Sequence, residues 1–258
     1  MLENNGESNF TTQEVKVKNR MALALTIISS VVVFHAPAYA SPAALANQAY
    51  ESGLDGWTSS GDVTATSESA VTTGAGGWII AAHQSQMAQL NSGSTDAQSL
   101  DTFFGLQAGA LEAAVFDVTN GAGIQQTFTG LAGETVTQYW DFVSRDYTGF
   151  NDSAFVVVNG AVTVLASIEN GGIEVGSYGH TGWQSFTYTL PTNGTYTLGF
   201  GVVNTKDTIL DGALFLDNQP GDTRPIISAI PEPETYALLI AGLALLGFVA
   251  KRKRSFAA

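Results

Sequence analysis

Acidic and amide side chains are concentrated in two short segments of the chain. The first contains Asp141, Asp146, Asn151 and Asp152 around Arg145, and the second contains Asp207 and Asp211. Loops rich in such oxygens bind sugar hydroxyls or hard cations. Asp and Asn are also common in loops because their side chains hydrogen bond to the nearby backbone. The sequence alone favours this second interpretation for both segments.

Aromatic rings offer a different chemistry, since the face of a pyranose packs flat on an indole or phenol ring. Five aromatic residues have Gly-rich or polar neighbours that favour exposure: Trp57, Trp78, Tyr147, Tyr178 and Trp183. Tryptophan is usually mostly buried in a sandwich core. We therefore expect Trp140 in the core, and we select Tyr147, Tyr178 and Trp183 as ligand-binding residues.

Residues for catalysis are scarce. His83 and His180 are the only histidines after residue 40, no serine lies in a Gly-x-Ser-x-Gly elbow, and a His-Glu-x-x-His motif is absent. A glycosidase needs only two carboxylates, so a hydrolase acting on extracellular polysaccharide stays open as an alternative. No acidic pair lies in an apolar sequence context, however. We therefore expect no catalytic residues and a protein that is not an enzyme.

Composition narrows the class further. The chain has 258 residues, of which 45% are hydrophobic and 13% charged, and it contains no cysteine. This composition excludes a disordered acidic chain, a disulfide framework and thiolate metal sites. The net charge of −13 argues against nucleic acid as a partner, because phosphate contacts require clustered Lys and Arg.

Alternation with a period of two dominates the middle of the chain. Strands are predicted at 63–66, 78–82, 124–129, 136–143 and 213–217. Two hairpins are predicted at Asn159-Gly160 and at Pro191-Thr192-Asn193-Gly194, because Asn and Gly tolerate positive φ. Short helices are expected only at 99–104 and 111–116. This pattern predicts an all-β fold, an antiparallel β-sandwich or jelly roll over residues 41–222 with a linker at 223–230 and no covering helices.

The N-terminal segment, residues 1–40, has the order of a secretory signal peptide. Basic residues at 16–20 precede an uncharged stretch at 21–34, and the small-x-small pattern of Ala38 and Ala40 follows. We expect a signal helix that the Sec export machinery recognises, with cleavage before Ser41; an uncleaved membrane anchor is the alternative. Three acidic residues precede the basic ones, which suggests translation from Val15.

The C-terminal segment, residues 231–258, has a second three-part order. Pro231-Glu232-Pro233 precedes an apolar run at 235–250, and Lys251-Arg252-Lys253-Arg254 follows at once. Sixteen helical residues span about 24 Å, a little less than a hydrocarbon core of about 30 Å, and bilayer thinning covers the difference. We expect a single transmembrane helix with a stop-transfer tail in the cytoplasm. A buried core helix is the weaker alternative because four cations follow it.

This tail resembles the PEP-CTERM sorting segment of Gram-negative bacteria. The resemblance implies transient recognition by an exosortase at the inner membrane, removal of the tail, and release or attachment at the cell surface. Proteins with this tail are associated with extracellular polysaccharide and biofilm matrix. The same tail also occurs on some ice-binding proteins.

The body resembles the galactose-binding-like jelly rolls of carbohydrate-binding modules. The resemblance rests on Tyr50-Glu51-Ser52-Gly53 with Gly56-Trp57 at its start and on Leu214-Phe215-Leu216-Asp217-Asn218 at its end. Such modules often hold a structural calcium ion where the first and last strands meet. The matching positions are Glu51 and Asp217, with backbone carbonyls and Asn218 to complete the shell. Two ordinary edge-strand acids facing water are the alternative.

Together these features favour an exported, non-catalytic matrix protein that binds an extracellular glycan. Residues 41–230 contain eighteen acidic and three basic residues, a balance of −15 that favours solubility outside the cell. Polysaccharide hydrolysis is the first alternative and ice binding the second. Ice binding needs regular ranks of threonine, and the sequence offers three separate Thr-x-Thr pairs at 64–66, 187–189 and 195–197.

Overall fold

The computed structural model describes residues 44–226 and 240–244. The predicted signal segment, including Ala38, Ala40 and Ser41, lies outside these ranges, as do Pro231, Glu232, Pro233 and the tetrabasic tail. Residues 240–244, inside the apolar run expected to span the membrane, are helical. Across the described ranges, no helix combines the length and hydropathy that a membrane crossing requires.

Residues 44–226 form an antiparallel β-sandwich, which confirms the predicted fold class. The seven-stranded sheet has the order β1-β7-β13-β9-β10-β11 with β6 beside β7, and the five-stranded sheet has the order β12-β8-β14-β5-β2. The strands of the first are β1 (Thr58–Ser60), β6 (Thr95–Asp96), β7 (Val118–Gly130), β9 (Ser153–Val158), β10 (Ala161–Ser167), β11 (Ile173–Glu174) and β13 (Gly194–Thr205). Those of the second are β2 (Asp62–Thr66), β5 (Met87–Asn91), β8 (Thr135–Val143), β12 (Gln184–Thr189) and β14 (Ala213–Asp217).

The alternation in β8 explains how these two sheets pack together. Val136, Trp140 and Phe142 lie in the core between them, each at most 3% exposed. The intervening residues, including Asp141 and Val143, point to the opposite face of the sheet. Trp140 is therefore a core residue, as predicted.

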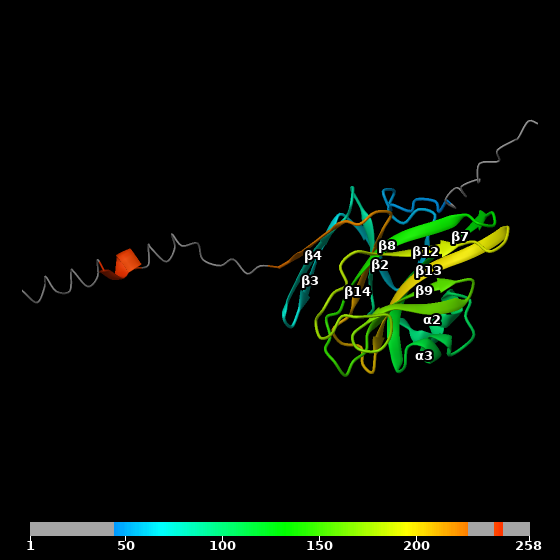
Figure 1. The fold of residues 1–258 in the computed structure, drawn as a ribbon. Helices are drawn as coiled ribbons and strands as arrows, with labels where there is room; N and C mark the ends of the chain where they lie inside the picture. Colours follow the sequence, from blue (N-terminus) through cyan, green and yellow to red (C-terminus); the bar gives the residue numbers. More distant parts are fainter. Residues whose placement is uncertain (1–43, 227–239, 245–258) are drawn as a thin grey trace, which may run out of the picture. The chain divides into compact units, whose positions relative to one another are not determined.

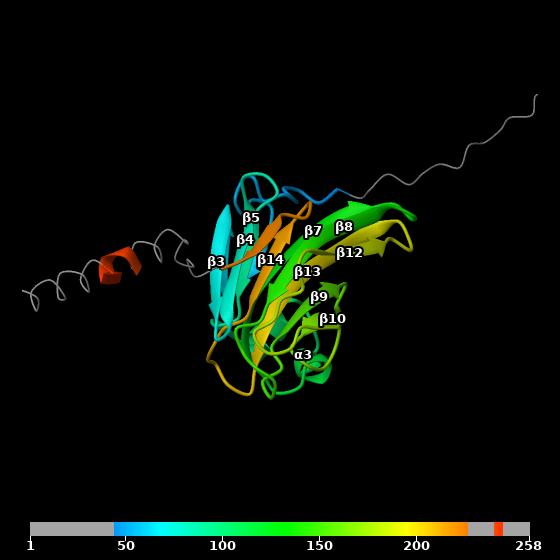
Figure 2. The ribbon, with the colours of Figure 1, turned by 60° about the vertical axis from the view of Figure 1, so that its left-hand side comes forward.

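A third sheet covers that opposite face. It consists of β3 (Glu68–Thr73), β4 (Gly76–Ala81) and β15 (Asp222–Pro225), in the order β15-β4-β3. Val71 and Ile80 from this sheet pack against Val143 and Phe215 of the five-stranded sheet. In Figure 1 the β3–β4 hairpin lies along one side of the sandwich, and Figure 2 shows it beside β5 and β14.

Two short helices cover part of the outer face of the seven-stranded sheet. They are α2 (Ala97–Phe103) and α3 (Ala110–Ala114), close to the predicted positions. Leu100, Phe104 and Leu111 pack on Phe155 and Val157 of β9. The expectation of no covering helices was therefore wrong, because Phe155 and Val157 form an apolar patch on the outside of this sheet. Figure 1 shows α2 and α3 beside β9.

One of the two predicted hairpins is confirmed. Asn159 and Gly160 join β9 to β10 with φ of 49° and 81°, the positive values that a two-residue turn needs. Residues 191–194 do not close a hairpin, since β12 pairs with β8 whereas β13 pairs with β7 and β9. Leu190, 1% exposed, lies in the core there. The turn therefore carries the chain from one sheet to the other.

The folded region extends past residue 222, where we expected a linker. Thr223, Arg224 and Pro225 pair with β4, and the Ile226 amide donates to the Gly77 carbonyl at 2.9 Å. The C-terminal strand β15 therefore belongs to the folded body and ends only a few residues before Pro231.

Candidate functional site

The predicted acidic segments meet at one end of the sandwich, which we call the loop end. It comprises residues 115–117, 144–152, 168–183 and 206–212, the connections that follow α3, β8, β10 and β13. Backbone hydrogen bonds join these segments: Tyr178 N donates to the Asp146 carbonyl at 2.8 Å, and Lys206 N donates to the Asp117 carbonyl at 2.8 Å. The loop end is therefore a connected surface built from four segments.

Tyr147 and Tyr178 lie together at the loop end. Their ring centroids are 6.2 Å apart, and Phe150 lies 5.1 Å from Tyr147. Tyr147 is 43% exposed. We call these three residues the aromatic cluster. Phe150 was not predicted, although it lies three residues after Tyr147 in the same loop.

Backbone hydrogen bonds fix the aromatic cluster in place. Besides the bond from Tyr178 to Asp146, Thr148 N donates to Ser177 Oγ at 3.0 Å. The Tyr178 ring lies over Gly74 at the tip of the β3–β4 hairpin, where an added Cβ would come within 2.6 Å of the ring. These contacts hold the backbone at Tyr178 and Thr148 and place the Tyr178 ring against the hairpin tip.

Trp183 does not join the aromatic cluster. Its ring packs at the edge of the hydrophobic core beneath the three-stranded sheet, and its indole Nε1 is buried with no hydrogen-bond partner among the described residues. Trp57 is 7% exposed and packs against Tyr50. The selection of Trp183 as a ligand contact therefore gains no support from its position.

The acidic residues of the loop end influence one another electrostatically. Asp152 is 1% exposed; its Oδ1 accepts from Thr205 N at 3.0 Å, while its Oδ2 has no partner among the described residues. Burial raises the pKa of Asp152 to about 8, and the charges of Asp146, Asp207 and Asp211 add to this shift. Burial also raises the pKa of Asp146. Burial and the neighbouring charges therefore keep the Asp152 carboxyl protonated at neutral pH.

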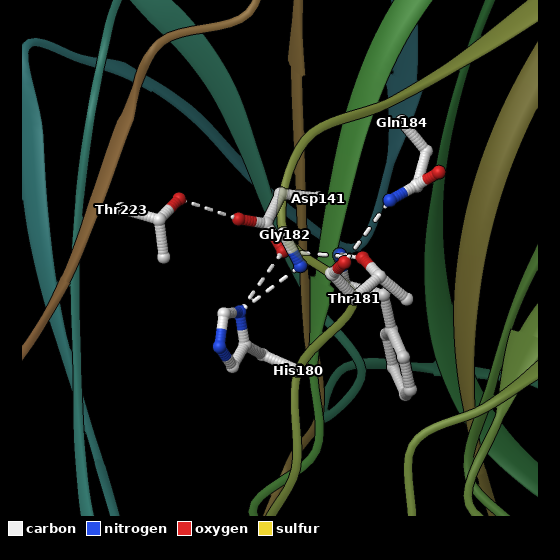
Figure 3. Close-up of polar contacts among 7 residues, drawn as sticks. Asp141, His180, Thr181, Gly182, Gln184 and Thr223 are labelled. Atoms are coloured by element: carbon white, nitrogen blue, oxygen red, sulfur yellow. Dashed lines mark hydrogen bonds and ion pairs between the residues drawn. The ribbon is translucent and has the colours of Figure 1, made fainter.

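Asp141 lies apart from these acids, beneath the three-stranded sheet (Figure 3). Thr223 Oγ1 of β15 donates to its Oδ2 at 2.8 Å, and Thr181 Oγ1 donates to its Oδ1 at 3.2 Å. Burial raises the pKa of Asp141 to about 6, although both hydroxyls oppose the shift. This carboxylate ties β8, β15 and the segment before β12 together.

His180 is next to Asp141 without forming a catalytic dyad. Its Nδ1 is 4.0 Å from Asp141 Oδ1 and accepts a hydrogen bond from Gly182 N at 3.0 Å (Figure 3). A dyad needs that nitrogen to donate to the carboxylate. The imidazole lies tilted against the Trp78 ring, with centroids 3.6 Å apart and an interplanar angle of 41°, and burial lowers the pKa of His180. This geometry favours a structural role.

Glu51 and Asp217 come together at the other end of the sandwich. Asp217 Oδ2 accepts from His83 N at 2.9 Å, and Glu51 Oε1 accepts from the amides of Ser85 and Gln86 at 3.0 and 3.2 Å. The two carboxylates thus hold the same short connection between β4 and β5. Burial raises the pKa of Asp217, and the charge of Glu51 acts in the same direction.

Residues that form hydrogen bonds to this pair leave several oxygen atoms unpartnered. Three buried amide oxygens lack hydrogen-bond partners among the described residues: Gln86 Oε1, Gln138 Oε1 and Asn218 Oδ1. Each belongs to a residue that donates a hydrogen bond to Glu51 or Asp217. Within residues 44–226 and 240–244, no three acidic or histidine side chains converge as metal ligands. A calcium ion here would therefore rely on amide and backbone oxygens besides the two carboxylates.

The predicted Thr-x-Thr pairs lie on different parts of the sandwich. Residues 64–66 and 187–189 are on opposite edge strands of the five-stranded sheet, and residues 195–197 are on β13 of the other sheet. Two of the pairs have threonines opposite them on the next strand: Thr187 lies opposite Thr137 and Thr197 opposite Thr127, with Oγ1 atoms 2.9 and 3.0 Å apart. The three pairs lie on three different strands, so the described residues form no continuous rank of threonines.

Comparison with known proteins identifies the tail. Residues 229–254 match the PEP-CTERM protein-sorting motif, so the chain carries the sorting segment that its C-terminal sequence indicated. The motif marks an exported protein processed by an exosortase. No curated protein matches the chain.

The solved structures similar to this chain include carbohydrate-binding modules. One is TmCBM61 in complex with β-1,4-galactotriose, at 14% identity over 72% of this chain and 99% of that one, with a TM-score of 0.36. Another is a Family 16 Carbohydrate Binding Module, at 13% identity over 70% and 98%, with a TM-score of 0.34. A third is the CBM22-1 xylan-binding domain from Paenibacillus barcinonensis Xyn10C, at 14% identity over 74% and 99%, with a TM-score of 0.26. Similarity of this extent assigns no ligand to the present chain.

Proposed function

We propose that this protein is a non-catalytic glycan-binding protein of the bacterial cell surface or extracellular matrix, delivered there by exosortase sorting. The observation that carries the proposal is the aromatic cluster of Tyr147, Phe150 and Tyr178 on the loop end. Tyr147, the exposed ring of the cluster, offers an apolar face to the C–H face of a sugar, and the half-buried Phe150 and Tyr178 pack beside it. The sorting motif supports an extracellular setting.

The absence of catalysis is part of the proposal. Asp141 and His180 make the closest approach of a carboxylate to an imidazole in the described part of the chain, and their hydrogen bonds are directed to structural partners. Retaining glycosidases need two carboxyl groups about 5 Å apart and inverting ones about 6.5–9.5 Å apart, open to the substrate. Among the described residues, the buried acids Asp141 and Asp152 make hydrogen bonds to protein groups, which favours structural roles for both.

A binding experiment tests this proposal. The full-length chain, purified in mild detergent, is applied to immobilised polysaccharides, and reducing ends released into solution are measured in parallel. We expect saturable binding without release of reducing ends, and about threefold to tenfold weaker binding by Tyr147→Ala. Tyr147→Phe, which keeps the ring, serves as the matched control. Release of reducing ends would instead establish the hydrolase alternative, and thermal hysteresis without glycan binding would establish ice binding.

A further inference from the structure

A hollow of about 290 Å³ opens at the loop end, on the side of α3. Its walls come from the residues that follow α3, from Asn151 in the 144–152 loop, from Glu169 and Asn170 after β10, and from Lys206 after β13. Its volume is near the lower end of small-molecule sites, about 300–1,000 Å³. It therefore suits one sugar ring better than a long segment of chain.

Phe116 forms the apolar wall of this hollow and is 74% exposed, the largest value among the large hydrophobic side chains of the described residues. Neighbouring hydrogen bonds hold this part of the chain: Glu112 accepts from the amides of Asp117 and Val118 at 3.0 and 2.9 Å, and Lys206 N donates to the Asp117 carbonyl at 2.8 Å. An exposed aromatic residue on a chain segment held in this way is expected to contribute to recognition.

Asn151 builds the polar wall. Its Oδ1 accepts from the amides of Glu169 and Asn170 at 2.9 and 3.1 Å, and its Nδ2 donates to the Asn170 carbonyl at 3.1 Å. These bonds use both ends of the Asn151 side-chain amide and fix the backbone of Glu169 and Asn170 at the edge of the hollow. Asn151 therefore acts as a positioning residue.

Three polar groups remain for a ligand. Glu169 Oε1 accepts from Gly149 N at 3.0 Å, whereas its Oε2 and the Asn170 side-chain amide form no hydrogen bond within the described part of the chain. Lys206 Nζ donates to the Gly149 carbonyl and retains two further protons. These groups can form hydrogen bonds to the hydroxyls of a pyranose, which both donate and accept. The Phe116 ring can pack against the C–H face of the same sugar.

The charge around the hollow selects against acidic sugars. Glu112 and Asp117 line an adjoining hollow that shares Lys206, and the charges of Asp146, Asp207 and Asp211 act on Asp152 at the same end of the sandwich. Without the protonated Asp152, these acids still outnumber the two cations of the loop end, Arg145 and Lys206, and the excess negative charge disfavours a uronate carboxylate. The ligand class is therefore an uncharged sugar.

We propose that this hollow binds one uncharged pyranose residue of a neutral polysaccharide, with Phe116 stacked on the sugar and Glu169, Asn170 and Lys206 bonding to its hydroxyls. This inference rests on the proposed glycan-binding function. It adds a second sugar-binding position to the one proposed at the aromatic cluster. Tyr147 and Phe150 of the aromatic cluster lie on the 144–152 loop, whose Gly149 is held by both Glu169 and Lys206.

The experiment compares Phe116→Ala, Phe116→Trp and Leu131→Ala on immobilised neutral glucan, galactan, mannan and xylan and on polygalacturonate. Leu131 is a matched control because it is 58% exposed and lies between β7 and β8, outside the loop end. We expect full-length wild type to bind a neutral polymer, Phe116→Ala to bind about tenfold more weakly, and Phe116→Trp and Leu131→Ala to bind like wild type. Melting temperatures check that the variants fold.

The outcomes separate this inference from the function on which it rests. If wild type binds none of the polymers, the glycan-binding function is overturned. If wild type binds and Tyr147→Ala weakens binding while Phe116→Ala does not, the hollow is not a sugar site although the function stands. Preference of wild type for polygalacturonate would overturn the assignment to an uncharged sugar.

Discussion

A single buried carboxylate at the loop end makes the stability of this protein depend on pH. Asp152 has a pKa of about 8 against an ordinary value of 3.8, with burial as the largest cause. Between these values the folded chain keeps a proton that the unfolded chain has lost, so the free energy of unfolding falls as pH rises. The loss is about 1.4 kcal/mol for each pH unit in that window, as an upper bound.

Asp152→Asn tests this dependence, because the amide imitates the protonated acid and its Oδ1 still accepts from Thr205 N. We expect wild type to lose stability in urea between pH 5 and pH 8.5, and Asp152→Asn to lose distinctly less. His180, whose pKa burial lowers, contributes the opposite trend below about pH 6.5 in both proteins. Parallel curves for the two proteins across this range would contradict the assignment.

The hydroxyl of Thr223 makes a second prediction at the scale of one residue. It donates to the buried Asp141 Oδ2, and hydrogen bonds to charged groups contribute about 1.5–3 kcal/mol. We expect Thr223→Val to lower the free energy of unfolding by an amount in that range at pH 8, where Asp141 is ionised. The effect should shrink toward pH 5, below the pKa of about 6, because the protonated acid attracts the hydroxyl less.

Thr72→Val is the matched control for this change. Thr72 is an exposed strand residue of the same three-stranded sheet, and its side chain forms no hydrogen bond within the described residues. We expect it to change stability by less than about 0.5 kcal/mol at either pH. Equal effects of the two substitutions would show that the contact with Asp141 contributes nothing.

At the scale of elements, the joining of the first and last segments of the sandwich predicts a response to calcium. Glu51 and Asp217 hold the connection between β4 and β5, and the side-chain amide oxygens of Gln86, Gln138 and Asn218 have no hydrogen-bond partner among residues 44–226. We expect millimolar calcium to raise the melting temperature, chelator to lower it, and Asp217→Ala to abolish both responses.

Asp62→Ala is the control for the calcium experiment, because Asp62 is an exposed acid on β2 that contacts Asn91 and lies outside this group. It should keep the full response. A wild-type protein whose melting temperature is unaffected by either calcium or chelator would show that Glu51 and Asp217 serve only to hold the connection through its amides.

The sequence predicts the strands well where one face is buried. The alternation of Val136, Trp140 and Phe142 gave the orientation of β8 because only one register puts these residues in the core. The prediction of a hairpin at residues 191–194 was wrong because the same turn residues occur whether the next strand pairs with the previous one or crosses to another sheet. The long-range pairing of β13 with β7 and β9 determines which of the two arrangements forms.

The candidate sites were predictable to a different extent. Tyr147 and Tyr178 were selected for their polar neighbours, and loop hydrogen bonds bring them together. Trp183 has neighbours of the same kind but packs at the edge of a core, because long-range contacts with the three-stranded sheet decide its burial. Phe116 follows the buried Val115 at the end of a short helix, and no local pattern distinguishes its exposed ring from a core phenylalanine.

At the scale of the whole molecule, charge is divided between body and ends. Residues 41–230 hold eighteen of the 23 acidic residues, whereas seven of the ten basic ones lie outside them. This division suits a body that crosses the inner membrane and a tail that stops there, because basic residues are retained on the cytoplasmic side. The negative charge of residues 41–230 also disfavours contact with anionic lipid headgroups.

This arrangement predicts the products of export. We expect the mature protein to begin at Ser41 and to lack the basic tail, as measured by the intact mass of protein from the cell surface or medium. Replacing Pro231, Glu232 and Pro233 with alanine should leave N-terminal cleavage unchanged, since the two signals are separate, but should hold the full tail in the membrane fraction. The Thr72→Val protein should be processed like wild type. Normal release of the triple-alanine variant would mean that the matched motif at 229–254 does not direct processing, and the proposed extracellular function would lose its route of delivery.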